Sequence, residues 1–230
     1  ARITVPNNAV SLRRAGEWFE VELEYGQSLR GRCVVVATGA RYRKLGIPDE
    51  ETLSGVFYAA TALEARFCGA DPVVVVGGGN AAGQAAMFLS ERSSTVHLVH
   101  RGDDLESSMS HYLIARLKKT SNVVLKLGCT IEALAGANQQ LRGVTIQDAN
   151  GASEQLSTAG LFVMIGAEPR TDWLRGVVEL DDYGYVLTGF DLPPTLTPWS
   201  RSGFATTEPG VFAVGDVRSG SVKRVASAVG

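Results

Sequence analysis

A glycine-rich segment in the first half of the chain has the residue types and spacing of a dinucleotide-binding turn. Valines at residues 73–76 lead into Gly77-x-Gly79-x-x-Ala82. In this fingerprint the first glycine makes the turn, the second lets a pyrophosphate approach the backbone, and the third position keeps the helix close to the strand. The phosphates would bind the free N–H groups and the positive dipole end of a helix that begins near Asn80. The alternative is a tight turn in an α/β protein that binds no nucleotide.

The residues after the next predicted strand favour one nicotinamide cofactor. A strand over residues 95–99 follows a single helix and ends at His100 and Arg101, about 20 residues beyond the glycines, where the ribose-reading residue belongs. Cations there suit the 2′-phosphate of NADP, whereas NAD calls for a carboxylate that accepts from the ribose hydroxyl. The pattern favours NADP, with NAD as the alternative. For Arg101 an ordinary solvated strand end is the competing interpretation.

Elements on either side of this unit complete an α/β pattern. Residues 1–31 alternate apolar and polar, which predicts an antiparallel meander with one wet face. Residues 33–37 predict a buried strand that stops at Thr38 and Gly39. Residues 73–165 predict a βαβαβ unit with an inserted hairpin whose turn is at 150–151. Residues 211–216 predict a short strand ending in Asp216, and residues 223–229 the start of a helix.

Composition restricts the function classes. The chain has 230 residues, of which 45% are hydrophobic and 20% charged, and a formal charge of −2, which gives no electrostatic footprint for nucleic acid or an anionic membrane. The apolar runs are too short to span a bilayer, and we expect a cytoplasmic protein. Cys33, Cys68 and Cys129 form no CxxC, match no metal-ligand spacing, and are expected to be small core residues in a reducing compartment.

Four segments in order resemble the pyridine nucleotide-disulfide oxidoreductases, and particularly the low-molecular-weight thioredoxin reductases. They are residues 35–48, 76–82, 166–169 and 210–217. The resemblance implies an α/β fold of two Rossmann-like nucleotide-binding domains, with the NAD(P)H domain inserted in the FAD domain. Residues 1–54 and 169–230 would then form the FAD-binding domain and residues 55–168 the NAD(P)H-binding domain. The family also implies a homodimer, and a rotation of the inserted domain about the two crossings.

The fingerprint and the resemblance together predict the cofactor contacts. For NADP or NAD these are Gly77, Gly79, Asn80, Ala81, Ala82, His100, Arg101 and Gly166. For FAD they are Thr38, Gly39, Gly215, Asp216, Arg224, Val225 and Ala226. The Asp216 carboxylate would accept from ribityl or ribose hydroxyls, and the helix beginning at Arg224 would face the isoalloxazine. The family's next two arginines after Arg101 are replaced by Gly102 and Glu106, which keeps NADH open as an alternative to NADPH.

Two departures from the family pattern bear on function. The family's redox-active CxxC falls on Ala59-Ala60-Thr61-Ala62, so no thiolate is available for disulfide exchange and no catalytic residue is assigned. The family's first βαβ unit, which carries the FAD-binding GxGxxG, is not in the sequence, which begins in the meander. We expect that an upstream segment is omitted. The alternative is weak FAD binding.

These features predict an FAD-dependent NAD(P)H oxidoreductase of thioredoxin reductase type with a non-thiol electron acceptor. A quinone, oxygen, or an iron–sulfur or flavin protein would accept the electrons. Hydride transfer between the cofactors needs no general acid or base, and His97, His100 and His111 share no metal-ligand spacing. One alternative is a redox-sensing module that binds FAD or NAD(P)H without turnover. Another is a thioredoxin reductase in which the alanines at 59 and 62 are introduced substitutions.

Overall fold

The chain folds into two compact units, each with its own core. The computed structural model describes residues 3, 5–192 and 202–221. Unit 1 comprises Ala1–Arg41 and Ala167–Gly230, and unit 2 comprises Tyr42–Gly166. The chain leaves unit 1 through β5 (Ala40–Tyr42) and returns through β14 (Ala167–Pro169), and these strands pair in a two-stranded sheet.

Unit 2 is built on a five-stranded parallel sheet with the strand order β6-β13-β7-β8-β9. This confirms the predicted βαβαβ unit, because β7, α2, β8, α3 and β9 follow one another in the chain. The strands are β6 (Val56–Phe57), β7 (Val73–Val76), β8 (Val96–His100), β9 (Val123–Leu127) and β13 (Gly160–Val163). The helices are α1 (Ala62–Cys68), α2 (Asn80–Ser90) and α3 (His111–Lys119).

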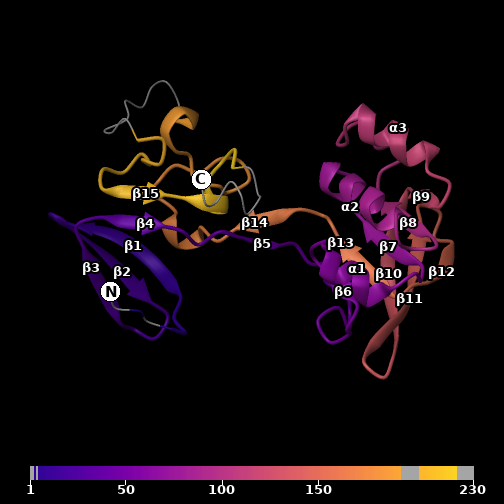
Figure 1. The fold of residues 1–230 in the computed structure, drawn as a ribbon. Coiled ribbons are helices and arrows are strands. Elements are labelled where there is room, and N and C mark those ends of the chain that lie inside the picture. The colour runs from indigo at the N-terminus through magenta and orange to yellow at the C-terminus, as the bar shows by residue number, and fades with distance from the viewer. Residues whose placement is uncertain (1–2, 4, 193–201, 222–230) are drawn as a thin grey trace. The chain divides into compact units, whose positions relative to one another are not determined.

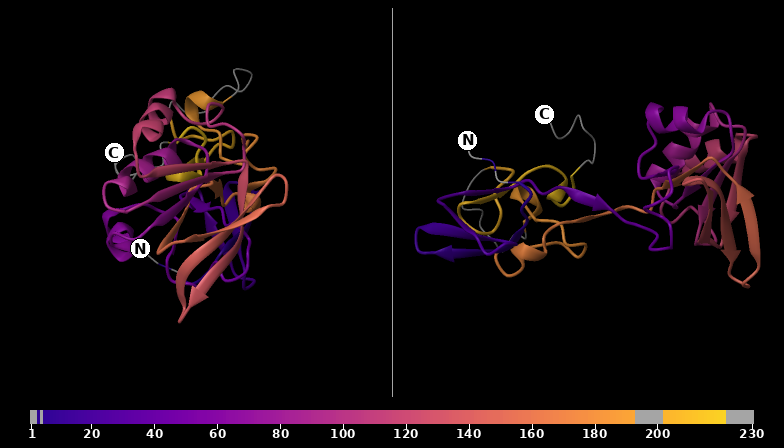
Figure 2. Two further views of the ribbon diagram at one scale, coloured as in Figure 1. Left: turned by 90° about the vertical axis from the view of Figure 1, so that its right-hand side faces the viewer. Right: turned by 90° about the horizontal axis from the view of Figure 1, so that it is seen from below.

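The parallel sheet is covered on both faces, as Figures 1 and 2 show. Val73 and Val75 pack with the helices, whereas Val74 and Val76 pack against an antiparallel sheet of β10, β11 and β12. A parallel strand buried on both faces needs a continuous apolar run, which explains the four consecutive valines.

The antiparallel sheet of unit 2 consists of β10 (Cys129–Ala137), β11 (Gln140–Asp148) and β12 (Ser153–Ser157). The hairpin of β11 and β12 confirms the predicted turn at 150–151. Strand β10 is not predicted from the sequence, because Ile131 is the one buried side chain in that strand and the alternation is therefore weak.

Unit 1 contains the predicted meander of β1 (Ala9–Ala15), β2 (Trp18–Leu23) and β3 (Ser28–Gly31). It packs on a parallel pair, β4 (Val34–Val36) and β15 (Val211–Ala213). The predicted burial of residues 33–37 holds for Val36 but is wrong for Cys33, Val35 and Ala37, which are exposed, Val35 to 61%. Successive side chains of a strand point to opposite faces, and only the face of Val36 joins the core of the described residues.

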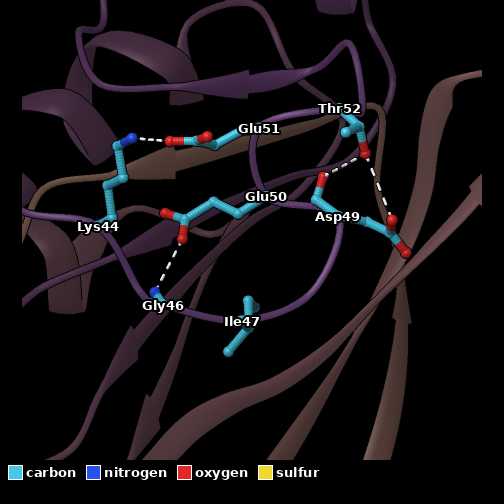
Figure 3. Close-up of a pocket in the computed structure, with 7 residues that line it drawn as sticks. All are labelled: Lys44, Gly46, Ile47, Asp49, Glu50, Glu51 and Thr52. Carbon is cyan, nitrogen blue, oxygen red and sulfur yellow. Dashed lines mark hydrogen bonds and ion pairs between the residues drawn. The ribbon is translucent and has the colours of Figure 1, made fainter.

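The first boundary between the compact units lies at residues 41 and 42, whereas the first FAD-binding segment is predicted to extend to residue 54. Residues 42–54 belong to unit 2 because Glu50 ties them to it. The buried Glu50 carboxylate accepts from the N–H groups of Leu45 and Gly46, both at 2.8 Å, and from the Tyr58 hydroxyl at 2.9 Å. Figure 3 shows Glu50 reaching back to Gly46 across the loop. Ser54 is also inside unit 2, since its carbonyl accepts from the Leu141 N–H at 2.8 Å.

Candidate functional site

The turn after β7 leaves no room for a side chain at its first glycine. Gly77 has a φ of +145°, and a Cβ there would lie 2.4 Å from the Met164 carbonyl oxygen and 3.1 Å from the Ala82 Cβ. Ala82 is fully buried. This is the close approach of helix to strand that the dinucleotide fingerprint requires of its first and third positions.

The second glycine of the fingerprint opens the start of α2 to a ligand. Gly79 is the N-cap, and no side chain caps the helix and no acid lies in its first turn. A Cβ on Gly79 would meet a single atom within 4 Å, the Ser108 carbonyl oxygen at 3.8 Å. The N–H groups of the first turn have no intrahelical acceptors, and Asn80 and Ala81 are exposed. This end of the helix can therefore bind an anion through its backbone.

Three consecutive residues that the sequence analysis did not single out lie against this turn. The Ser108 hydroxyl donates to the Gly78 carbonyl at 2.8 Å, and the Ser110 N–H donates to the Asn80 carboxamide oxygen at 2.8 Å. Between them the buried Met109 packs on α2 where Gly83 leaves space, since a Cβ on Gly83 would lie 2.8 Å from the Met109 Sδ. We call residues 108–110 the strap. The sequence of the strap carries no pattern that predicts these contacts.

His100 ends β8, and Arg101 follows it at the same edge of the sheet. The His100 ring lies against the glycine turn, because a Cβ on Gly78 would be 2.2 Å from its Cε1. Arg101 is exposed, and among the described residues no acid pairs with it. The nearby Asp104 carboxylate is engaged in its own turn, where it accepts from the Glu106 and Ser107 N–H groups. The Arg101 guanidinium is thus free for an anionic ligand.

The predicted flavin contacts in unit 1 lie at one edge of the parallel pair. Val36 of β4 is in register with Ala213 of β15, so the turns that follow both strands emerge at the same carboxyl end. The Thr38 hydroxyl donates to the Arg170 carbonyl at 3.2 Å. Gly39 and Gly215 have φ values of +63° and +73°, and among the described residues no atom lies within 4 Å of a Cβ at either position.

Asp216 is the charged group at this edge. Its carboxylate is partly buried, and no described residue bonds to it. Arg224, Val225 and Ala226 lie outside the described residues. Gly166, predicted as an NAD(P)H contact, is the exposed last residue of unit 2, and its carbonyl accepts from the Arg43 N–H at 3.0 Å.

The segment matched to the family's CxxC begins helix α1. Thr61 is the N-cap, and its backbone N–H donates to the Glu64 carboxylate at 2.9 Å in a capping box. The hydrogen bond from the Thr61 side chain lowers the pKa of Glu64. Cys68, at the other end of α1, is buried, and burial with nearby Asp71 raises the pKa of its thiol to about 11. It is a structural thiol, not a nucleophile.

The described ranges hold neither a metal-binding cluster nor a membrane-spanning helix. No group of three or more histidine, cysteine, aspartate or glutamate side chains could hold a metal ion there. No helix in that part of the chain has the length and apolarity needed to cross a membrane.

Comparison with known proteins places the chain in a family. The profile of the pyridine nucleotide-disulphide oxidoreductases matches residues 3–230. A thioredoxin reductase of Streptomyces clavuligerus is 33% identical over 229 residues, which cover 98% of this chain and 66% of that protein. The thioredoxin reductase of Escherichia coli O157:H7 is 36% identical over 191 residues, which cover 80% of this chain and 56% of that protein.

The solved structures agree. Thioredoxin reductase from Streptococcus pyogenes MGAS5005 superposes with a TM-score of 0.74 at 27% identity, over 97% of this chain and 69% of that one. The chain thus spans between 56% and 66% of the length of these two curated relatives. The match of the family profile over nearly every residue, together with the glycine turn and the Rossmann-like sheet, shows that the chain belongs to the pyridine nucleotide-disulphide oxidoreductase family and is similar to its thioredoxin reductases.

Proposed function

We propose that this chain is part of an FAD-dependent NAD(P)H oxidoreductase that passes electrons to a non-thiol acceptor. Two features of this thioredoxin reductase-like chain support the proposal together. The start of α2 has no side-chain cap and is opened by Gly79, and residues 59 and 62 are both alanine. Thioredoxin reductases use FAD and NADPH. When bound, the two cofactors supply hydride transfer from the nicotinamide to the flavin.

The role of unit 2 is to bind and orient NAD(P)H. The N–H groups at the start of α2 hold the pyrophosphate, and Gly79 lets it approach. Arg101 lies where the 2′-phosphate of NADP belongs, and its lack of a described acidic partner supports NADPH over NADH. His100 is engaged against Gly78, so we assign it a packing role beside the cofactor and not a charge contact.

The role of unit 1 is to hold FAD at the carboxyl edge of β4 and β15. Asp216 has carboxylate oxygens free, among the described residues, to accept from flavin hydroxyls, and a Cβ at Gly39 or Gly215 would meet no described atom within 4 Å. These residues fit FAD, and no residue of the chain is assigned a proton transfer. The family resemblance also predicts a homodimer, which sedimentation velocity of the full-length protein would check.

The acceptor is the part of the proposal that separates this chain from thioredoxin reductases. NAD(P)H and a proton supply two electrons and two protons, which would convert a quinone to a quinol or oxygen to hydrogen peroxide. Cys68 cannot replace a CxxC, because it is buried with a pKa of about 11. Disulfide reduction is therefore not expected.

Steady-state turnover tests this proposal. The full-length protein, loaded with FAD, is assayed for NADPH oxidation with a soluble quinone, with oxygen, and with thioredoxin disulfide. We expect turnover on the quinone or oxygen and none on thioredoxin. Turnover on thioredoxin would contradict the proposal. Tight nucleotide binding with no turnover on any acceptor would favour a redox-sensing module.

A further inference from the structure

We propose that the strap, residues 108–110, is a built-in brace that fixes the glycine turn in its nucleotide-binding conformation, with Ser108 and Asn80 as positioning residues. The inference deepens the proposed function and rests on it. Ser108, Met109 and Ser110 each contact a different point of the turn and of the first part of α2: Gly78, Gly83 and Asn80 respectively.

The contact to Gly78 fixes the direction of a peptide group. The Gly78 carbonyl and the Gly79 N–H belong to one planar trans peptide, so they point in opposite directions. By donating to that carbonyl at 2.8 Å, the Ser108 hydroxyl turns the Gly79 N–H away from the strap. Glycine has little conformational preference of its own, so an outside contact is what holds this peptide in a single orientation.

The contact to Asn80 keeps the end of the helix free. Asparagine near a helix N-terminus can satisfy the free N–H groups with its own side chain. Here the carboxamide oxygen of Asn80 instead accepts from the Ser110 N–H at 2.8 Å, and α2 has no side-chain cap. The donors of the first turn therefore stay available to a pyrophosphate.

Met109 anchors the brace in the core. Its side chain is 3% exposed and packs with Leu113 of α3 against the α2 surface at Gly83. Because this anchor is part of the main helical core, the strap is preformed before the nucleotide arrives. A preformed site binds its ligand without a cost of ordering, so the brace acts on affinity more than on the rate of the chemical step.

Neighbouring serines provide a matched test. Ser108→Ala removes the hydroxyl that bonds Gly78, and Ser108→Thr restores it. Ser107→Ala is the control, because within the described chain the Ser107 side chain makes no hydrogen bond. NADPH binding to the full-length protein is measured by calorimetry, and amide hydrogen exchange of residues 77–82 is measured without nucleotide.

We expect Ser108→Ala to bind NADPH about three- to tenfold more weakly, as for loss of one hydrogen bond. Its KM for NADPH should rise with kcat unchanged, and exchange across residues 77–82 should be faster. Ser107→Ala and Ser108→Thr should match the wild type. If the Ser108→Ala and Ser107→Ala proteins have equal NADPH affinity and equal amide exchange, the proposed role of the strap is wrong, whereas the proposed function stands. Failure of the wild type to bind either NADPH or NADH would overturn the proposed function as well.

Discussion

The two units hold their proposed nucleotide-binding turns in different ways. In unit 2 the turn follows a strand that is buried on both faces, and Met164, His100 and the strap surround it. In unit 1 the turns follow β4 and β15, where Val35 is 61% exposed. One side-chain bond, from Thr38 to the Arg170 carbonyl, fixes the loop after β4 within the described residues.

This contrast indicates at which positions nucleotide binding and folding stability are coupled. A turn packed on all sides cannot change without disturbing the core, whereas an open turn can lose a ligand contact and keep its fold. We therefore expect substitutions in the unit 2 turn to affect folding and binding together at tightly packed positions. Substitutions of side chains at the flavin edge of unit 1, other than at the positive-φ glycines Gly39 and Gly215, should affect binding alone.

The largest effect is expected at Gly77. Gly77→Ala forces a Cβ toward the Met164 carbonyl at a positive φ, so it should lower the free energy of unfolding by about 3 kcal/mol or more and abolish NADPH binding. Gly79→Ala is the matched control for folding, since its Cβ would make only an ordinary contact, 3.8 Å from the Ser108 carbonyl oxygen. It should change stability by less than about 1 kcal/mol yet block the approach of the pyrophosphate. Urea denaturation and calorimetry of both variants separate the two effects.

A smaller loss of stability is expected at Glu50. Glu50→Ala leaves two backbone N–H groups and the Tyr58 hydroxyl without their acceptor, at a cost of about 2–4 kcal/mol. Glu51→Ala is the control, because Glu51 is exposed and pairs with Lys44 at the surface. Proteolysis at residues 43–49 should accelerate only in the Glu50 variant. Equal protection in both variants would show that Glu50 does not hold this segment on unit 2.

At the flavin edge we expect a change in affinity without a change in fold. Asp216→Ala should weaken FAD binding about tenfold or more, as for loss of a charge-assisted hydrogen bond, and leave the denaturation midpoint close to that of the wild type. Fluorescence of released flavin measures the FAD affinity, and urea titration measures the denaturation midpoint. A large stability loss would mean that Asp216 is structural.

Substitution of Arg101 tests which nicotinamide nucleotide the protein prefers. Arg101→Ala should weaken NADPH binding about tenfold or more and leave NADH binding within about twofold, because only NADPH carries the 2′-phosphate. Lys118→Ala, on α3, is a control for the loss of a positive charge from the same unit. If NADPH and NADH weaken together in the Arg101 variant, the residue does not read the 2′-phosphate.

The smallest effect is a pH dependence from His97. Burial, with a contribution from Lys126, lowers the pKa of His97 below its usual value of 6.5, and its buried Nδ1 has no hydrogen-bond partner among the described residues. The unfolded state then binds more protons, so stability is fully present above about pH 6.5 and declines as the pH falls through the folded-state pKa. The loss should be less than about 1 kcal/mol because the side chain is partly exposed. His97→Gln should flatten this slope in urea titrations between pH 5 and 7.5.

Whether a feature of the fold or site can be predicted from the sequence depends on how far apart in the chain the interacting residues are. The valine run, the glycine turn and the alternation of the meander are local patterns, so the elements of the site could be predicted. The strap could not, because Ser108 and Ser110 lie 30 residues from the groups they contact. The attachment of residues 42–54 to unit 2 also depends on the folded chain, which brings the Tyr58 hydroxyl to the Glu50 carboxylate.

We expect unit 2 to bind a nicotinamide nucleotide that reduces a flavin. An anaerobic titration of the FAD-loaded, full-length protein with NADPH, followed by flavin absorbance, tests it most directly, with Gly79→Ala as the matched variant. We predict rapid bleaching in the wild type and none at the same NADPH concentration in the folded Gly79→Ala protein. Bound flavin that the wild type does not bleach with NADPH or NADH, or equal bleaching in both proteins, would contradict the claim.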